Sequence, residues 1–498
     1  MRFTGIDYAI VVFYLVGVAL FGILFSGKQK NAQDYFLGSR KIPWWAVCFS
    51  IVATETSTLT FISIPGLAYI TNMGFLQLAF GYLIGRIVIA FTLIPKYYSG
   101  NLDTAYHFLG KRFGEPMRKY SSITFILIRI FADGVRLFTT AIPIKFITGM
   151  SYFECILIVG IITLIYSYLG GIKAVVWTDV VQMFIYVFAS IATIYVILRL
   201  LPDGWNTVTK FAMPENKFQI FNFSMISFKD FFTGSYNWIG GLLGGAFLSM
   251  ASHGTDQLIV QRLLTCDTKK ASQKAIIGSG VIVLVQFFIF LLIGVMLYAF
   301  YQGGAFSNLK IGSYFLKKTD EIFPKFIIEQ LPSGVSGLVV AGLLAASMST
   351  LSSAFNSLAS STIFDLLKSK ISSAAKQVTY SRLATLFWGI VIIGTGLLFV
   401  DETNPAVDYA LKIQSVLYGG LLGVFLIGVI VKKAGLAEAI ISYTATIVIL
   451  ITVFLLAQFK VIPALNLTWF TLFGVIISFA VTYLILLIKN IFGWKKDM

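Results

Sequence analysis

Charged residues are scarce in this sequence. They make up 12% of the 498 residues, whereas a soluble domain carries about 25%, and 57% of the residues are hydrophobic. This scarcity excludes an ordinary soluble protein and indicates a surface that mostly faces lipid. The net charge of +16 does not indicate nucleic-acid binding. The Lys and Arg residues lie in short loops between apolar runs, as the positive-inside rule predicts.

Cysteine and histidine are also rare. The three cysteines, Cys48, Cys155 and Cys266, lack the spacing of a disulfide framework or a metal site, and we interpret them as buried packing residues. The two histidines, His107 and His253, are far apart and belong to no catalytic motif. We therefore expect neither an enzyme nor a cofactor.

Long apolar runs are abundant instead. A membrane-spanning helix needs about 20 apolar residues, and backbone within the bilayer must satisfy its own hydrogen bonds, which favours helices. The sequence therefore predicts an all-α membrane protein with about thirteen transmembrane helices. Their expected ranges are 5–26, 44–71, 74–99, 116–148, 152–170, 174–201, 236–261, 274–302, 333–366, 378–400, 406–431, 434–458 and 468–490.

The basic residues predict an orientation. With this helix count, the basic clusters after the first, third, seventh, ninth and eleventh helices and at the C-terminus fall on one side. The longer loops, 202–235 and 303–332, mix both charges and fall on the other side. The positive-inside rule then places the N-terminus outside and the C-terminus in the cytoplasm, across a plasma (cell inner) membrane.

Two predicted spans are interrupted. Residues 53–60 place a polar run with one carboxylate, Glu55, inside the second span. Residues 239–245 place four glycines inside the seventh span, five helices later. Interrupted helices in corresponding halves mark the binding sites of secondary transporters. Each interruption alone has a structural explanation, because hydroxyls bond their own backbone and glycines permit close packing.

The matched positions of the interruptions predict an inverted repeat. We expect two five-helix units of opposite topology, at 44–201 and 236–431, within one transporter domain of 1–498. An extra helix at 5–26 precedes them, and two helices within 434–490 follow them.

A polar face on the 333–366 span indicates an ion site. Four residues at helical spacing lie on one side of this helix: Ala346, Ser349, Thr350 and Ser353. The hydroxyls, together with unwound carbonyls of Ala53 and Thr56, would form a cage of neutral hard oxygens, which suits Na⁺. A packing seam is the alternative interpretation of this face.

Three ionisable residues inside predicted spans are functional candidates, as such residues are in membranes. Asp179 could bind Na⁺, carry a proton or reach the membrane surface from near the helix start. Asp133 and Arg136 lie three residues apart and could pair with each other or line a solute cavity.

Three long motifs resemble the sodium:solute symporter family and occur in the family's order. They are Asp34-Tyr35-Phe36-Leu37 with Pro43-Trp44-Trp45, the stretch from Tyr168 to Gln182 that contains Trp177-Thr178-Asp179, and Gly254-Thr255-Asp256-Gln257 continuing to Gln261-Arg262. The match covers nearly the whole chain. Residues 60–65 and Ala68-Tyr69 are similar to the bacterial sialic acid transporters. The resemblance implies the leucine-transporter fold, with one helix before the repeat and two after it.

The resemblance also implies two sodium sites. The first is the family's common type and maps onto Ala53, Thr56, Ala346, Ser349 and Thr350. The second is found in sialic acid transporters of this type and maps onto Asp179, Ser349, Ser352 and Ser353. We therefore expect two Na⁺ per solute.

Family solute positions map onto Ser57, Thr60 and Phe75. The Arg that holds the sialic acid carboxylate falls on Ala132, so Arg136, one turn later, is the candidate replacement.

The candidate solute site also includes Asp133 and two glutamines, Gln77 and Gln414. A family Gln falls on Ala79, with Gln77 nearby, and Gln414 is polar among apolar residues. We expect a small polar solute, a sugar or sugar acid such as sialic acid. Another organic anion or a vitamin is the alternative.

The expected activity is solute import by Na⁺ symport and alternating access, in a functional monomer whose partners are the solute, Na⁺ and lipid. In this mechanism Na⁺ joins the 333–366 helix to the broken second span and so assembles the solute site. The main rival is a proton-coupled carrier that uses Glu55 or Asp179. A sensor or channel is a weaker rival, because only about eight residues follow the last predicted span, too few for a signalling domain.

Overall fold

The protein is almost entirely helical, as the apolar runs predict. The computed structural model describes residues 3–223, 227–234, 237–305, 308–311, 314–316, 318–367, 371, 373–399 and 406–492. Within these residues the strands are β1 (Lys310–Ile311) and β2 (Tyr314–Phe315), which pair antiparallel. Eight described helices are long and apolar enough to cross a membrane, or nine if one bent pair counts as a single span.

Helices occupy every predicted span. Their bounds are α1 Gly5–Leu24, α3 Trp44–Glu55, α4 Thr58–Ile70, α5 Leu76–Thr92, α6 Ile94–Tyr98, α8 Glu115–Thr148, α9 Tyr152–Leu200, α12 Gly245–Gly254, α13 Gln257–Leu263, α14 Lys269–Phe300, α16 Val335–Ser361, α17 Ala374–Leu398, α18 Ala406–Ile430, α19 Leu436–Gln458 and α20 Leu467–Ile491. Short helices lie between them: α2 Ala32–Leu37, α7 Ala105–Phe113, α10 Trp205–Ala212, α11 Phe228–Thr233 and α15 Ile322–Gln330. The count of thirteen spans, the repeat boundaries and their inverted relation remain predictions.

The two helices expected in 152–201 form one run, α9, with a kink at Gly171. The Gly171 backbone has φ 57° and ψ −153°, a conformation that is essentially restricted to glycine. A Cβ built on Gly171 would also lie 2.5 Å from the Tyr35 carbonyl oxygen. The kink therefore separates two arms without an intervening loop.

One predicted interruption is a break between two helices, and the other is a π-helical turn within a continuous helix. The second span breaks between α3 and α4, which are bent by 65°, and the Ser57 hydroxyl caps α4 by accepting from the Thr60 amide. At the glycine run, residues Gly240–Gly244 form a π-helical turn before α12. A further break follows α12, and the Asp256 side chain caps α13.

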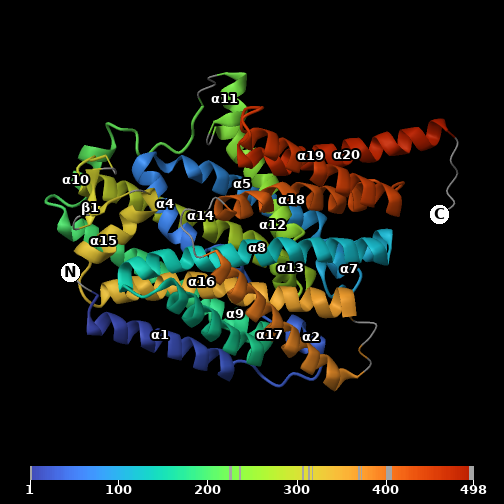
Figure 1. The fold of residues 1–498 in the computed structure, drawn as a ribbon, viewed down its shortest axis with the longest axis horizontal. Coiled ribbons are helices and arrows are strands. Elements are labelled where there is room, and N and C mark those ends of the chain that lie inside the picture. Colours follow the sequence, from blue (N-terminus) through green and yellow to red (C-terminus); the bar gives the residue numbers. More distant parts are fainter. Residues whose placement is uncertain are drawn as a thin grey trace.

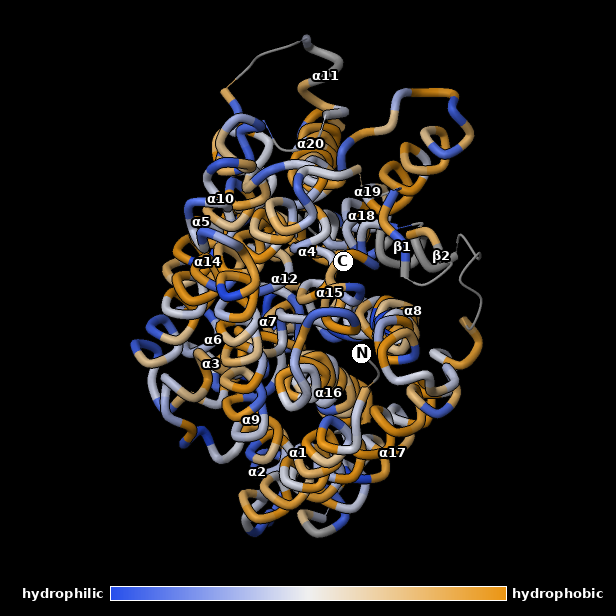
Figure 2. Tube along the Cα trace, turned by 90° about the vertical axis from the view of Figure 1, so that its left-hand side faces the viewer, coloured by the Kyte–Doolittle hydropathy of each residue, from blue (hydrophilic) through white to orange (hydrophobic). Residues whose placement is uncertain are grey.

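The helix α16 lies within the bundle, and the added helices lie at its edges. Figure 1 shows α1 along one edge and α19 and α20 along the opposite edge, with α8 and α16 between them. In the most apolar window of α16, 94% of residues are buried, against 22% in α1 and 28% in α20. Figure 2 shows hydrophobic residues along the outer helices, where Phe13 and Leu24 are about four-fifths exposed (82% and 80%). These outer faces suit lipid, and α16 provides an enclosed polar face.

Candidate cation and solute site

The broken end of α3 meets the polar face of α16. Because α3 ends at Glu55, the carbonyls of its last turn lack helical partners. The Ala53 carbonyl accepts a hydrogen bond from the Ser349 hydroxyl (2.8 Å), and the Thr54 carbonyl accepts one from Thr350 (3.1 Å). Both hydroxyls also lie within hydrogen-bond distance of the Ala346 carbonyl (3.1 and 3.2 Å).

These contacts bring together four of the five residues predicted for the first sodium site. The oxygens are neutral carbonyls and hydroxyls, a donor set that suits a hard monovalent cation. The fifth residue, Thr56, lies at the helix break, but its hydroxyl points elsewhere. It donates to the Val52 carbonyl (2.9 Å) and accepts from Gln286 (2.5 Å). A role for Thr56 through its carbonyl remains a prediction.

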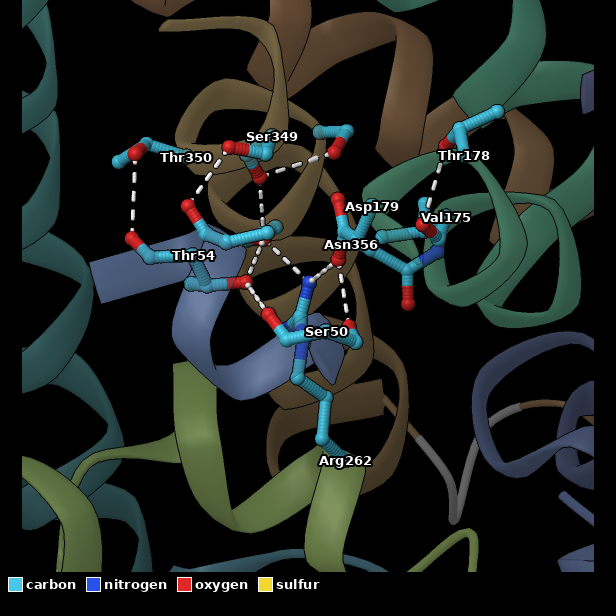
Figure 3. A network of polar contacts seen from close by, with 12 residues as sticks. Ser50, Thr54, Val175, Thr178, Asp179, Arg262, Ser349, Thr350 and Asn356 are labelled. Atoms are coloured by element: carbon cyan, nitrogen blue, oxygen red, sulfur yellow. Dashed lines mark hydrogen bonds and ion pairs between the residues drawn. The ribbon is translucent and has the colours of Figure 1, made fainter. Parts of the chain in front are cut away.

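Asp179 lies in a second buried polar cluster, shown in Figure 3. Its Oδ2 atom accepts from the Ser50 hydroxyl (2.5 Å) and from Arg262 Nη2 (3.1 Å). Arg262 also donates to Ser50 and to the hydroxyl of Ser353. All four side chains are fully buried. Asp179 and Ser353, which were predicted to bind one ion, are therefore linked through Arg262.

The other two residues of the predicted second sodium site lie on the same helix as Ser353. The hydroxyls of Ser352 and Ser353 both donate to the Ser349 carbonyl, over 3.0 and 2.5 Å. The sequence patterns did not identify Arg262 or Ser50 as members of this cluster. Arg262 stands in a family motif, but nothing in the sequence indicated that its side chain reaches Asp179.

A cavity of about 320 Å³ adjoins the predicted first sodium site, because Thr54 and Thr350 line it. Its volume falls in the usual range for small-molecule sites, about 300–1,000 Å³. Its walls come from the α3–α4 break and from α5, α8, α12, α13, α16 and α18. The polar residues that line it are Thr54, Glu55, Ser57, Thr60, Tyr82, Arg129, Arg136, Ser252, His253, Thr350, Gln414, Ser415 and Tyr418.

Four of the predicted solute residues line this cavity: Ser57, Thr60, Arg136 and Gln414. The other three are not among the lining residues. Phe75 packs against the Phe287 ring, 4.9 Å between centroids. The Gln77 amide donates to the Gly74 carbonyl (3.0 Å). Asp133 is fully buried.

Arg136 begins a polar network along one wall. Its guanidinium donates to the Asp133 carboxylate (2.9 Å) and to the Gln414 side chain (2.8 Å), so the predicted pairing of Asp133 with Arg136 is present. Gln414 in turn donates to the Tyr418 hydroxyl (2.7 Å), which donates to Asp256 (2.6 Å). The network therefore connects α8 and α18 to Asp256, the capping residue of α13.

Another residue of the cavity wall, Glu55, also belongs to an ion pair. Arg86, on α5, pairs with Glu55 and lies 3.0 Å from His253 Nε2. Arg86 is fully buried, and both Glu55 and His253 line the cavity. An arginine inside an apolar span meets the criterion that identified Asp179, so Arg86 could have been found from the sequence.

The comparisons with known proteins agree with this geometry. The sequence model of the family described as "Sodium:solute symporter family" matches residues 35–445. The chain is 28% identical to the "Sodium/sialic acid symporter NanT" of Aliivibrio fischeri over 453 residues, which cover 89% of this chain and 87% of that protein. It is 28% identical to the "Putative sodium-dependent multivitamin transporter" of Drosophila melanogaster over 446 residues, covering 87% and 72% of the two chains.

A solved structure is similar over almost the full length. It is described as the substrate-bound outward-open state of a Na⁺-coupled sialic acid symporter. The TM-score is 0.86 at 26% identity, and the match covers 97% of this chain and 98% of that chain.

Proposed function

Because the chain belongs to the sodium:solute symporter family and is a Na⁺-coupled membrane symporter rather than an enzyme, we propose that it imports a sugar or sugar acid such as sialic acid. We propose a stoichiometry of two Na⁺ per solute, alternating access, and a C-terminus in the cytoplasm. We also propose that the functional unit is a monomer and that it uses no cofactor.

The observation that carries the proposal is the contact of Ser349 and Thr350 with the broken end of α3, beside a polar cavity. A cation bound to these oxygens would join α16 to α3 and fix the position of Ser57 and Thr60 at the start of α4. Solute and ion would then stabilise the same arrangement, which is the condition for coupling. Each Na⁺ that enters gains about 2.3 kcal/mol per 100 mV of membrane potential.

Arg136 supports an acidic solute. In this proposal, Arg136 takes the role of the carboxylate-binding Arg of the sialic acid transporters, whose aligned position here holds Ala132. The Arg136 side chain lines the cavity and is 25% exposed. Charge-assisted bonds to a carboxylate are among the stronger hydrogen bonds in proteins. Ser57, Thr60 and Gln414 would bind hydroxyl or amide groups of the same solute. Another organic anion or a vitamin that carries a carboxylate fits the same donors.

A thermal-shift screen of the purified protein tests the proposal. Sialic acids, neutral sugars, vitamins and monocarboxylates are each added in NaCl and in KCl. The solute should raise the unfolding temperature more strongly in NaCl, because ligand binding stabilises the folded state. Equal shifts in the two salts would contradict Na⁺ coupling, and shifts by neutral sugars alone would contradict the acidic solute.

A further inference from the structure

The Arg262 side chain reaches into the group of residues proposed to bind the second Na⁺. It extends from α13 to α3, α9 and α16, as Figure 3 shows. Its guanidinium donates to the hydroxyls of Ser50 and Ser353 and forms an ion pair with Asp179. Two of the four residues proposed for that ion are therefore already bound to a positive charge.

The electrostatics of the cluster leave room for one cation at a time. Asp179 and Arg262 are both fully buried, so their charges are poorly screened. Asp179 supplies one negative charge, and in the described ion pairs it balances the one positive charge of Arg262. A Na⁺ beside the guanidinium would meet a like charge within a few ångströms in a medium of low dielectric constant.

The Asp179 carboxylate nevertheless has capacity for another ligand. Its Oδ2 atom carries both hydrogen bonds, whereas Oδ1 is buried and has no hydrogen-bond partner in the described part of the chain. Buried carboxylate oxygens are normally paired. The arrangement suits a carboxylate that exchanges one cation for another.

The position of Arg262 links this exchange to the solute cavity. Arg262 lies on α13, whose capping residue Asp256 accepts from Tyr418. Leu258 and Ile259, in the first turn of the same short helix, line the cavity together with Tyr418. A shift of α13 when the cavity wall rearranges would therefore also move the guanidinium relative to Asp179.

We infer that Arg262 is a tethered cation that occupies the second sodium site in this conformation, so that Na⁺ binds there only after α13 withdraws the guanidinium. This inference rests on the proposed function. Arg262 then competes with the second Na⁺, and the second sodium site is available to Na⁺ in only part of the transport cycle.

Salt titrations of thermal stability test the inference without any solute. Wild type and Arg262→Gln are titrated with NaCl against KCl at constant ionic strength. Without the fixed charge, the NaCl concentration at half-maximal stabilisation should fall by about tenfold, and adding Asp179→Asn should abolish that gain. The matched control is Arg118→Gln, which removes a buried arginine whose ion-pair partners are Asp365 and Glu115 and should leave the midpoint unchanged.

The possible outcomes separate the two claims. A wild-type response to Na⁺ with an unchanged or higher midpoint in Arg262→Gln overturns the competition but not the proposed function. A wild type that responds equally to Na⁺ and K⁺ overturns the proposed function, and the inference with it. If Arg262→Gln does not fold, Arg262→Met takes its place. This replacement also removes the positive charge beside Asp179, so the midpoint should still fall, and an unchanged midpoint overturns the inference.

Discussion

The hydroxyl of Ser349 on α16 donates a hydrogen bond to the carbonyl of Ala53 at the broken end of α3, over 2.8 Å. The two residues are 296 positions apart in sequence and belong to different predicted repeats. The contact joins the proposed ion site directly to the helix break. The contact also gives the most specific test of the ion site.

Replacement of Ser349 by Ala should weaken Na⁺ binding while leaving the fold intact. Loss of one oxygen ligand and its hydrogen bond is worth about 1–2 kcal/mol, so the Na⁺ concentration for half-maximal uptake should rise by about tenfold. Ser357→Ala is the matched control, because Ser357 is equally buried on α16 and bonds within its own helix to the Ala354 carbonyl. Equal effects of the two replacements would contradict the role of Ser349.

Replacement of Arg136 by Gln should weaken binding of an acidic solute. Hydrogen bonds to charged groups contribute about 1.5–3 kcal/mol, so the KM for the solute should rise by roughly 10- to 100-fold. The Na⁺ dependence at saturating solute should change little. Arg199→Gln serves as the control, since Arg199 is exposed on α9 and bonds to Tyr195. An unchanged KM in Arg136→Gln would argue for a solute without a carboxylate at this position.

Replacement of Arg86 by Ala should destabilise the protein. It would leave the Glu55 carboxylate, which is 16% exposed at the cavity wall, without its main partner, a change that costs about 3 kcal/mol. Unfolding in detergent, followed by circular dichroism, measures the loss. The double replacement Glu55→Gln with Arg86→Ala should recover part of it. Strict additivity of the single replacements Glu55→Gln and Arg86→Ala would contradict this pairing.

Replacement of Gly171 by Ala should reduce the yield and stability of folded protein. The required backbone conformation costs a non-glycine residue about 1–3 kcal/mol, and the added Cβ would clash with the Tyr35 carbonyl. Gly394→Ala is the control, because Gly394 lies in α17 with nothing within 4 Å of an added Cβ. If both replacements are tolerated equally, the kink does not depend on this glycine.

Much of the fold was predictable from hydropathy, because helices fill every apolar run, although some runs are divided between two helices and two runs join in α9. The polar run at residues 53–60 also predicted the break between α3 and α4 correctly. The single run of α9 was not predictable, since nothing in the pattern distinguishes a kinked glycine from a short loop. The second interruption was located by its glycines, but they form a π-helical turn rather than an open break.

The candidate site was predictable where residues share one helix. The spacing of Ser349 and Thr350 placed both hydroxyls on one face, and the structure turns that face toward α3. Contacts between distant segments were not predictable. The approach of Arg262 to Asp179 and the pairing of Arg86 with Glu55 depend on how α13 and α5 pack, which no local pattern contains.

Uptake into proteoliposomes tests the central claim of Na⁺ symport most directly. The solute that stabilises the purified protein is supplied outside, with an inward Na⁺ gradient, an inward K⁺ gradient or an inward pH gradient in Na⁺-free buffer. We predict accumulation above equilibrium only with the Na⁺ gradient, and its collapse when the gradient is dissipated. Accumulation driven by the pH gradient without Na⁺, or equal uptake under all three gradients, would contradict the account.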